Sequence, residues 1–283
     1  MRRALSLLAA FLLAAAQADG PDPVRPDPES PRPIAALDTV FLEEMTWMEV
    51  RDALRGGKDT AIVATGGVEQ NGPYLAAGKH NYVLRATTEA IARKLGNALV
   101  APIVAFVPEG DIDPPTEHMR YPSTIGVTDE TFRGLLTDIC ASLRAHGFAR
   151  IVLIGDSGGN QRGMKEVAAD LDTRWADGEG KKTRVVYIPE YYDYPGVARW
   201  LERQGVKQTP EGLHDDFAIT AIMMTVDPTT VRMPQRIAAG KFRINGVELA
   251  PAEATIAWGR KIVDYRAETT VTALRRAMAR PAH

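Results

Sequence analysis

Short apolar runs alternate along this chain of 283 residues with longer segments in which apolar residues recur at helical spacing. The runs at 61–64 and 151–154 contain no polar residue, which is typical of strands covered on both faces. Strands are expected at 61–64, 98–106, 151–154 and 184–188, and helices at 82–95, 129–146, 164–171, 215–226 and 252–279. This order predicts an α/β protein with a mainly parallel sheet between two helical layers, a three-layer α/β/α sandwich.

The N-terminal region predicts export from the cytoplasm. Arg2 and Arg3 precede an uncharged apolar run, and a small-x-small cleavage site ends at Ala18, so residues 1–18 are expected to be a signal peptide. The apolar run is shorter than the roughly 20 residues that span a bilayer, although an uncleaved anchor is the alternative. The expectation is a periplasmic or secreted protein without stable membrane insertion after cleavage.

Two further segments follow the predicted signal peptide. Proline recurs densely through residues 19–36, and this composition favours a linker because proline cannot hold a helix or a strand ladder. Residues 37–283 are long enough for one large domain. Charged residues make up 25% of the chain and the formal net charge is −2, so nucleic acid is not an expected partner. Cys140 is the only cysteine, which excludes an internal disulfide.

A glycine-rich loop follows the first predicted strand and carries Glu69 and Asn71, with His80 a few residues further on. Binding sites in open α/β sheets lie at the carboxyl ends of the strands, where this loop begins. A carboxylate in such a turn can bind a divalent metal or act as a general base, or it can accept backbone N–H bonds. The residues alone do not choose between these roles.

The turn after the strand at 151–154 has the pattern Gly-x-Ser-x-Gly and contains Asp156 and Ser157. A serine nucleophile in this context would need an acid and a histidine downstream, and Asp193 and His214 are available. The structural alternative is that Ser157 caps the next helix or lines a pocket.

Two other loops carry candidate residues. The proline-rich loop at 107–122 contains the pair Glu117 and His118. His214 precedes Asp215 and Asp216 at the start of an apolar helix, where one of the acids is expected to be the N-cap and the histidine to be a general acid or base.

Several of these motifs together resemble the creatininase (creatinine amidohydrolase) family. The resemblance runs from Asp38 to the C-terminus, through Gly66-Gly-Val-Glu-Gln-Asn-Gly-Pro-Tyr-Leu-Ala-Ala-Gly-Lys-His80, Thr116-Glu-His118, His146-Gly-Phe148 and Gly155-Asp-Ser-Gly-Gly-Asn160. It implies an α/β/α sandwich, one or two divalent metal ions, commonly zinc or manganese, and hydrolysis of cyclic amides and related C–N bonds. It also implies a homo-oligomer.

The family's metal ligands fall in this chain on Glu69, Asn71, His80 and Ser157, so only the glutamate is retained. We therefore expect an altered divalent-metal site. The expected metal ligands are Glu69, His80 and Asp156. The expected catalytic residues are His118, Asp156, Ser157 and His214, and the expected substrate contacts are Asn71, Glu117, Asn160 and Asp216.

The functional hypothesis is an exported hydrolase that acts on a small cyclic or linear amide, with no nucleotide cofactor. Two alternatives stay open. One is a metal-free serine hydrolase that uses Ser157, and the other is a non-catalytic ligand-binding protein on the same scaffold.

Overall fold

The computed structural model describes residues 24–177, 182–212 and 214–279. The chain divides into two units, Met1–Ala35 and Ala36–His283. In the first unit, residues 24–35 form no helix or strand, and the predicted signal peptide lies outside the described residues. None of the described helices combines the length and the apolar character needed to cross a membrane.

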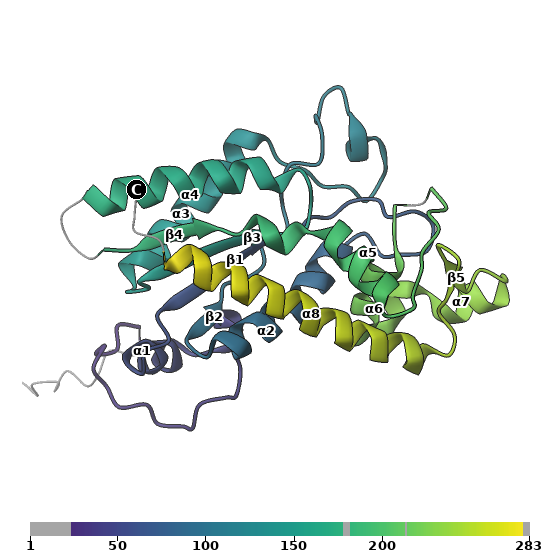
Figure 1. Cartoon of the computed structure of the whole chain (residues 1–283). Coiled ribbons are helices and arrows are strands. Elements are labelled where there is room, and N and C mark those ends of the chain that lie inside the picture. The colour runs from purple at the N-terminus through teal and green to yellow at the C-terminus, as the bar shows by residue number, and fades with distance from the viewer. Residues whose placement is uncertain (1–23, 178–181, 213, 280–283) are drawn as a thin grey trace, which may run out of the picture. The chain divides into compact units, whose positions relative to one another are not determined.

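The second unit is built on a parallel sheet of four strands, β1 (Thr60–Thr65), β2 (Ala98–Val100), β3 (Arg150–Gly155) and β4 (Arg184–Tyr187). Their order in the sheet is β2-β1-β3-β4, and each neighbouring pair is parallel (Figure 1). Thr65 pairs with Gly155 at the carboxyl ends of β1 and β3. The loops that follow these two central strands therefore start side by side, which confirms the predicted parallel sheet.

The helices surround this sheet. They are α1 (Trp47–Arg55), α2 (Lys79–Leu95), α3 (Asp129–Ala145), α4 (Asn160–Asp177), α5 (Tyr194–Arg203), α6 (Phe217–Val226), α7 (Met233–Ala238) and α8 (Ala252–Met278). Short 3₁₀ turns occur at η1 (Leu42–Glu44), η2 (Glu117–Arg120), η3 (Pro189–Tyr192) and η4 (Pro228–Val231), and β5 (Arg243–Ile244) pairs antiparallel with β6 (Val247–Glu248).

Alternation along the central strands divides the core into two layers. Val63 and Leu153 point to the face covered by α3 and α4, whereas Ile62 and Val152 point to the face covered by α2 and α8. These four side chains are at most 1% exposed. Side chains alternate between the two faces of a strand, so a run without polar residues requires helices on both sides. The α/β/α sandwich is therefore confirmed.

The helix ends follow the local chemistry of the sequence. Thr128 caps α3 by accepting a hydrogen bond from the Thr131 N–H at 3.2 Å, and Asp216 caps α6 by accepting one from the Ile219 N–H at 2.7 Å. Gly96 ends α2 with a φ of 79°, a left-handed conformation that favours glycine. Asp216 is thus the N-cap expected from the sequence for α6, and Thr128 and Gly96 follow the usual preferences for helix caps.

One boundary differs from the expectation in a way that matters for the site. The helix expected at 82–95 begins at Lys79, so Lys79 and His80 lie in its first turn and are buried.

The strand expected at 98–106 is shorter than predicted. It ends at Val100, because Pro102 cannot donate to a ladder, and Val104 forms only an isolated bridge to Thr65.

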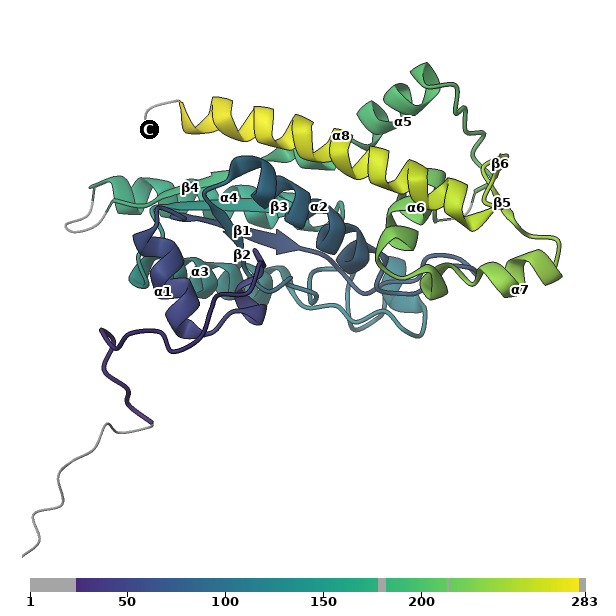
Figure 2. The same ribbon diagram turned by 90° about the horizontal axis from the view of Figure 1, so that it is seen from below.

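A third apolar cluster lies beyond the sheet and includes the whole buried length of α6, from Phe217 to Met224. Figure 2 shows α8 running alongside α2 and past α6, and these helices contact one another. This packing brings the start of α6, and the segment before it, to the sheet edge where the loops after β1 and β3 begin.

Leu153→Ala should destabilise the protein by about 2–5 kcal/mol, because it removes most of a fully buried side chain from the central strand and leaves a cavity. Leu135→Ala on α3 is the matched control, since Leu135 is 39% exposed and its truncation should change stability by less than about 0.5 kcal/mol. Urea unfolding measures both. Equal losses would contradict the assignment of β3 to the centre of the core.

Candidate functional site

The candidate site lies at the carboxyl ends of β1 and β3 and is centred on Glu69, which is 2% exposed. Backbone and amide bonds fix its loop. The Glu69 N–H donates to the Ala77 carbonyl at 3.0 Å, and the Asn71 side-chain amide donates to the Glu69 and Ala76 carbonyls, both at 3.0 Å. The Asn71 side chain therefore fixes the conformation of this loop.

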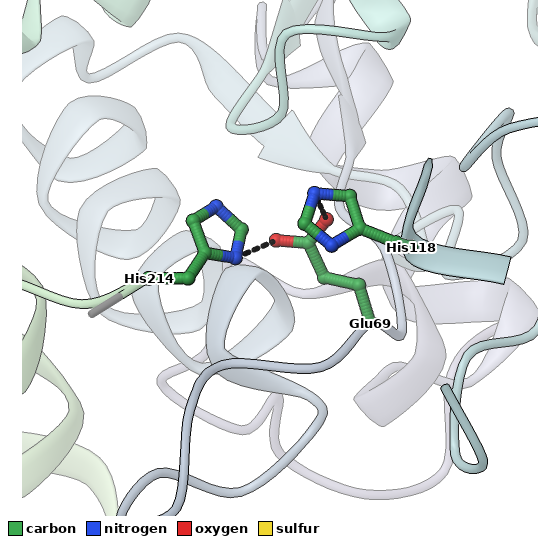
Figure 3. A group of neighbouring side chains, drawn as sticks. All are labelled: Glu69, His118 and His214. Carbon is green, nitrogen blue, oxygen red and sulfur yellow. Dashed lines mark ion pairs between the residues drawn. The ribbon is translucent and has the colours of Figure 1, made fainter. Parts of the chain in front are cut away.

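Four basic side chains surround the Glu69 carboxylate. Oε1 lies 2.8 Å from His80 Nε2, 3.2 Å from Lys79 Nζ and 3.6 Å from His214 Nδ1. Oε2 lies 3.4 Å from His118 Nε2. Figure 3 shows His214 paired with one oxygen of this carboxylate and His118 with the other, and the two rings stack with centroids 4.6 Å apart.

His80 joins Glu69 to a second buried carboxylate. Its Nε2 lies 2.8 Å from Glu69 Oε1, and its Nδ1 lies 2.8 Å from Asp156 Oδ2. Burial opposes the charge on this ring, but hydrogen bonds to Asp156 and Glu69 outweigh it and raise the pKa of His80. The ring therefore carries both protons and donates to a carboxylate from each nitrogen.

Asp156 continues the charged network toward α8. Arg266 Nη2 donates to Asp156 Oδ1 at 2.8 Å, and the Tyr194 hydroxyl lies 2.9 Å from both carboxylate oxygens. Burial favours the neutral acid, but Arg266 and His80 hold the pKa of Asp156 below its usual value. In the same way, burial is outweighed at Glu69 by His80 and Lys79, which hold its pKa far below its usual value.

The pKa of a third buried carboxyl, that of Glu109, is shifted in the opposite direction. This side chain is 3% exposed, and burial together with the neighbouring Glu69 charge raises the pKa of Glu109 to about 9. At neutral pH it is a protonated acid beside an ionised one. Gly67 leaves room for the Glu109 carboxyl, since its φ is 154° and a Cβ there would lie 2.3 Å from Glu109 Oε1.

Glu69, His118 and His214 form a group that could hold a metal ion, because one ligand atom from each lies within 4.8 Å of the others. One carboxylate and two imidazoles suit zinc or manganese. Ligand bonds of about 2.1 Å in a tetrahedral arrangement place neighbouring ligand atoms about 3.4 Å apart, and His118 Nε2 is 3.4 Å from Glu69 Oε2. His214 Nδ1 donates to the Gln70 carbonyl at 3.0 Å, which orients that ring and leaves Nε2 as the nitrogen with a lone pair for a metal. The donor set fits one divalent ion.

A pocket of about 360 Å³ opens beside this group. It is lined by Lys79, His80, Asp156, Tyr192, Tyr194, Pro195, His214, Asp215, Asp216 and Ile219. Its size suits a small molecule. Burial, then the negative charges of Asp156 and Glu69, raise the pKa of Tyr192, so its hydroxyl stays protonated.

The structure brings most of the residues singled out in the sequence to this edge. The expected ligands Glu69 and Asp156 both contact the third, His80, whose two nitrogens each lie 2.8 Å from a carboxylate oxygen. His118 and His214 form a candidate metal-ligating group with Glu69.

The other expected residues are placed less directly. Ser157 is 6% exposed, and no hydrogen bond within the described part of the chain joins its hydroxyl to a histidine. Asn160 is fully buried and donates to the Thr65 and Gly66 carbonyls, at 3.1 and 2.8 Å. Glu117 is exposed.

The sequence reasoning missed Lys79, Glu109, Arg266 and Tyr194. A lysine directly before a candidate ligand was the available signal for Lys79. Arg266 lies within the long helix α8, 110 residues from its partner Asp156, and local sequence carries no signal for that pairing.

Comparison with known proteins agrees with this fold. The family profile described as "Creatininase: Creatinine amidohydrolase" matches residues 43–274, so the chain belongs to the creatininase family. Creatinine amidohydrolase of Pseudomonas putida is 25% identical over 170 residues, which cover 59% of this chain and 64% of that protein. The 3-dehydro-scyllo-inosose hydrolase of Thermotoga maritima is 27% identical over 119 residues, covering 42% and 36%. This chain thus aligns with less than two thirds of either relative.

Solved structures show the same fold. A manganese creatininase superposes with a TM-score of 0.62 at 20% identity, and the match covers 86% of this chain and all of that one. A zinc–zinc form of a creatininase variant superposes with a TM-score of 0.61, also at 20% identity and with the same coverage.

Glu109→Gln should flatten the pH dependence of stability. The pKa of the unfolded carboxyl is about 4.3, against about 9 in the folded chain. The folded state therefore binds the extra proton between these values, and its stability falls as the pH rises, by at most about 1.4 kcal/mol per pH unit. The substituted amide has no proton to lose, so the wild type should weaken relative to this variant between pH 5 and pH 8.

Urea unfolding in EDTA at several pH values makes this measurement without bound metal. Glu130→Gln on the exposed first turn of α3 is the control, and it should leave the slope as in the wild type. Parallel profiles for the wild type and Glu109→Gln would contradict a buried, protonated Glu109.

Proposed function

We propose that this protein hydrolyses a C–N bond of a small cyclic or linear amide, with one divalent ion held by Glu69, His118 and His214. The observation that carries the proposal is the convergence of these three side chains, with ligand atoms within 4.8 Å of one another, beside a pocket that His214 also lines. Family membership supports the reaction class, since both aligned relatives are hydrolases by name.

Two of the proposed ligands, Glu69 and His214, are in the protonation states that such an ion needs. A bound zinc or manganese ion would supply Lewis-acid polarisation of the amide carbonyl and a water of lowered pKa. Burial, reinforced by Lys79, lowers the pKa of His214, so the ring is neutral at pH 7. His80 and Lys79 keep Glu69 ionised.

The other pocket residues would orient the amide. Tyr192 and Lys79 present an O–H and an N–H to the pocket, where they could donate to a carbonyl oxygen as negative charge develops on it. The buried bonds from His80 to Asp156, and from Asp156 to Arg266, hold the Glu69 side of the site in one geometry before substrate arrives.

Glu69→Ala should remove both bound metal and activity. Metal-loaded wild type should contain zinc or manganese in stoichiometric amount by mass spectrometry and should turn over at least one amide in a panel that includes creatinine, hydantoin and dihydrouracil. Loss of the carboxylate should lower kcat/KM by more than about 100-fold, because a ligand and its orienting contacts go together.

His146→Ala is the control, since His146 is an exposed residue that caps the far end of α3. It should keep both metal and rate. An equal loss in this variant, or a Glu69→Ala protein that retains metal and turnover, would refute the assignment.

The same assays separate the two alternatives. A serine hydrolase would be labelled by a fluorophosphonate at Ser157 and would lose activity in Ser157→Ala, whereas the proposed mechanism retains activity there. A non-catalytic binding protein would turn over no amide at all.

We also propose that the protein is exported to the periplasm or secreted and that it forms a homo-oligomer. The support is the N-terminal sequence pattern and the family resemblance. Expressed with its own N-terminus in a bacterium with two membranes, it should fractionate with the periplasm and start directly after Ala18 on N-terminal sequencing. A variant that lacks residues 1–18 should stay in the cytoplasm, and cytoplasmic full-length protein would contradict export.

A further inference from the structure

Lys79 places a cation inside the candidate metal site. It is the first residue of α2 and is 2% exposed. Its Nζ lies 3.2 Å from Glu69 Oε1 and 3.2 Å from the His214 carbonyl, and it lies 3.4–3.5 Å from both ring nitrogens of His214. The ammonium thus contacts two of the three residues that form the metal-ligating group.

His80 fills the space between the two buried carboxylates of the site. Each ring nitrogen lies 2.8 Å from a carboxylate oxygen, one on Glu69 and one on Asp156. An ion that bridged these two carboxylates would have to occupy the volume of the ring itself. No such position is free unless the side chain leaves.

Basic side chains already face both buried carboxylates of the network. Lys79 and His80 lie against Glu69, and His80 and Arg266 lie against Asp156. A divalent ion bound at Glu69 would lie close to the Lys79 nitrogen and would compete with it for the same carboxylate oxygen. Like charges in such a low-dielectric setting repel strongly.

We propose that Lys79 is a built-in cation that competes with a divalent ion for Glu69, and that His80 closes the position of a second ion. The chain would then hold at most one zinc or manganese ion, weakly, at Glu69, His118 and His214. This inference rests on the metal site of the proposed function, and it concerns how tightly and how many ions bind rather than what is hydrolysed.

Titration calorimetry of metal-stripped full-length protein with Mn²⁺ tests the competition. Lys79→Met removes the charge, keeps much of the side-chain length and should tighten Mn²⁺ binding at least tenfold, whereas Lys79→Arg keeps a cation and should bind as weakly as the wild type. Lys79→Gln repeats the neutral substitution in case the methionine variant does not fold. Lys94→Met near the end of the same helix is the matched control and should leave the affinity unchanged.

Each outcome decides between the claims. Tighter binding in the neutral variants, with one ion per wild-type chain, supports the proposal. Two ions per wild-type chain would overturn the claim that His80 closes the second position. Equal Mn²⁺ affinity in wild type and Lys79→Met would overturn the claim that Lys79 competes with the ion. Neither result would contradict the proposed hydrolase activity. No Mn²⁺ or Zn²⁺ binding to any variant would remove the metal site of the proposed function, and this proposal with it.

Discussion

The rest of the site depends on the two hydrogen bonds of the His80 imidazole, one from each ring nitrogen to a buried carboxylate. The ring ties Glu69, in the loop after β1, to Asp156, in the turn after β3, and Asp156 in turn anchors Arg266 of α8. Three elements distant in the sequence are thereby joined by buried charges. Removing one member of such a network typically costs about 3–5 kcal/mol, because it leaves an uncompensated charge. The geometry around Glu69 is therefore set by global packing as well as by its own loop.

The parallel sheet explains why this network can form at all. Apolar runs without polar residues require helices on both faces, so polar loops gather at the ends of the strands, and binding sites in such sheets lie at the carboxyl ends. The paired ends of β1 and β3 bring the Glu69 loop and the Asp156 turn together, and the buried helix α6 delivers His214 to the same edge. Fold and site follow from one constraint, the burial of the central strands.

Much of the fold and part of the candidate site could be predicted from the sequence, and the remaining contacts could not be predicted for physical reasons. The strands, the α/β/α layers, the caps at Thr128 and Asp216 and the importance of Glu69 are encoded locally, in apolar periodicity and turn chemistry. The partner of Asp156 is not, because Arg266 lies in a long amphipathic helix where any of several polar positions could face inward. The start of α2 was also hidden, since the residues before it form a glycine-rich loop without a side-chain N-cap.

The residues that differ from the creatininase motif are linked through the contacts they make around Glu69. Asn71 stands where the resemblance places a histidine ligand, and its NH2 group bonds two backbone carbonyls, so the position supports the loop. His80 stands where the family has an aspartate, and an imidazolium there reverses the sign of the charge. That reversal is stable only because both neighbours, Glu69 and Asp156, are carboxylates. The family fold is thus kept, and in the proposed site the His80 and Lys79 side chains lie against carboxylates of the network.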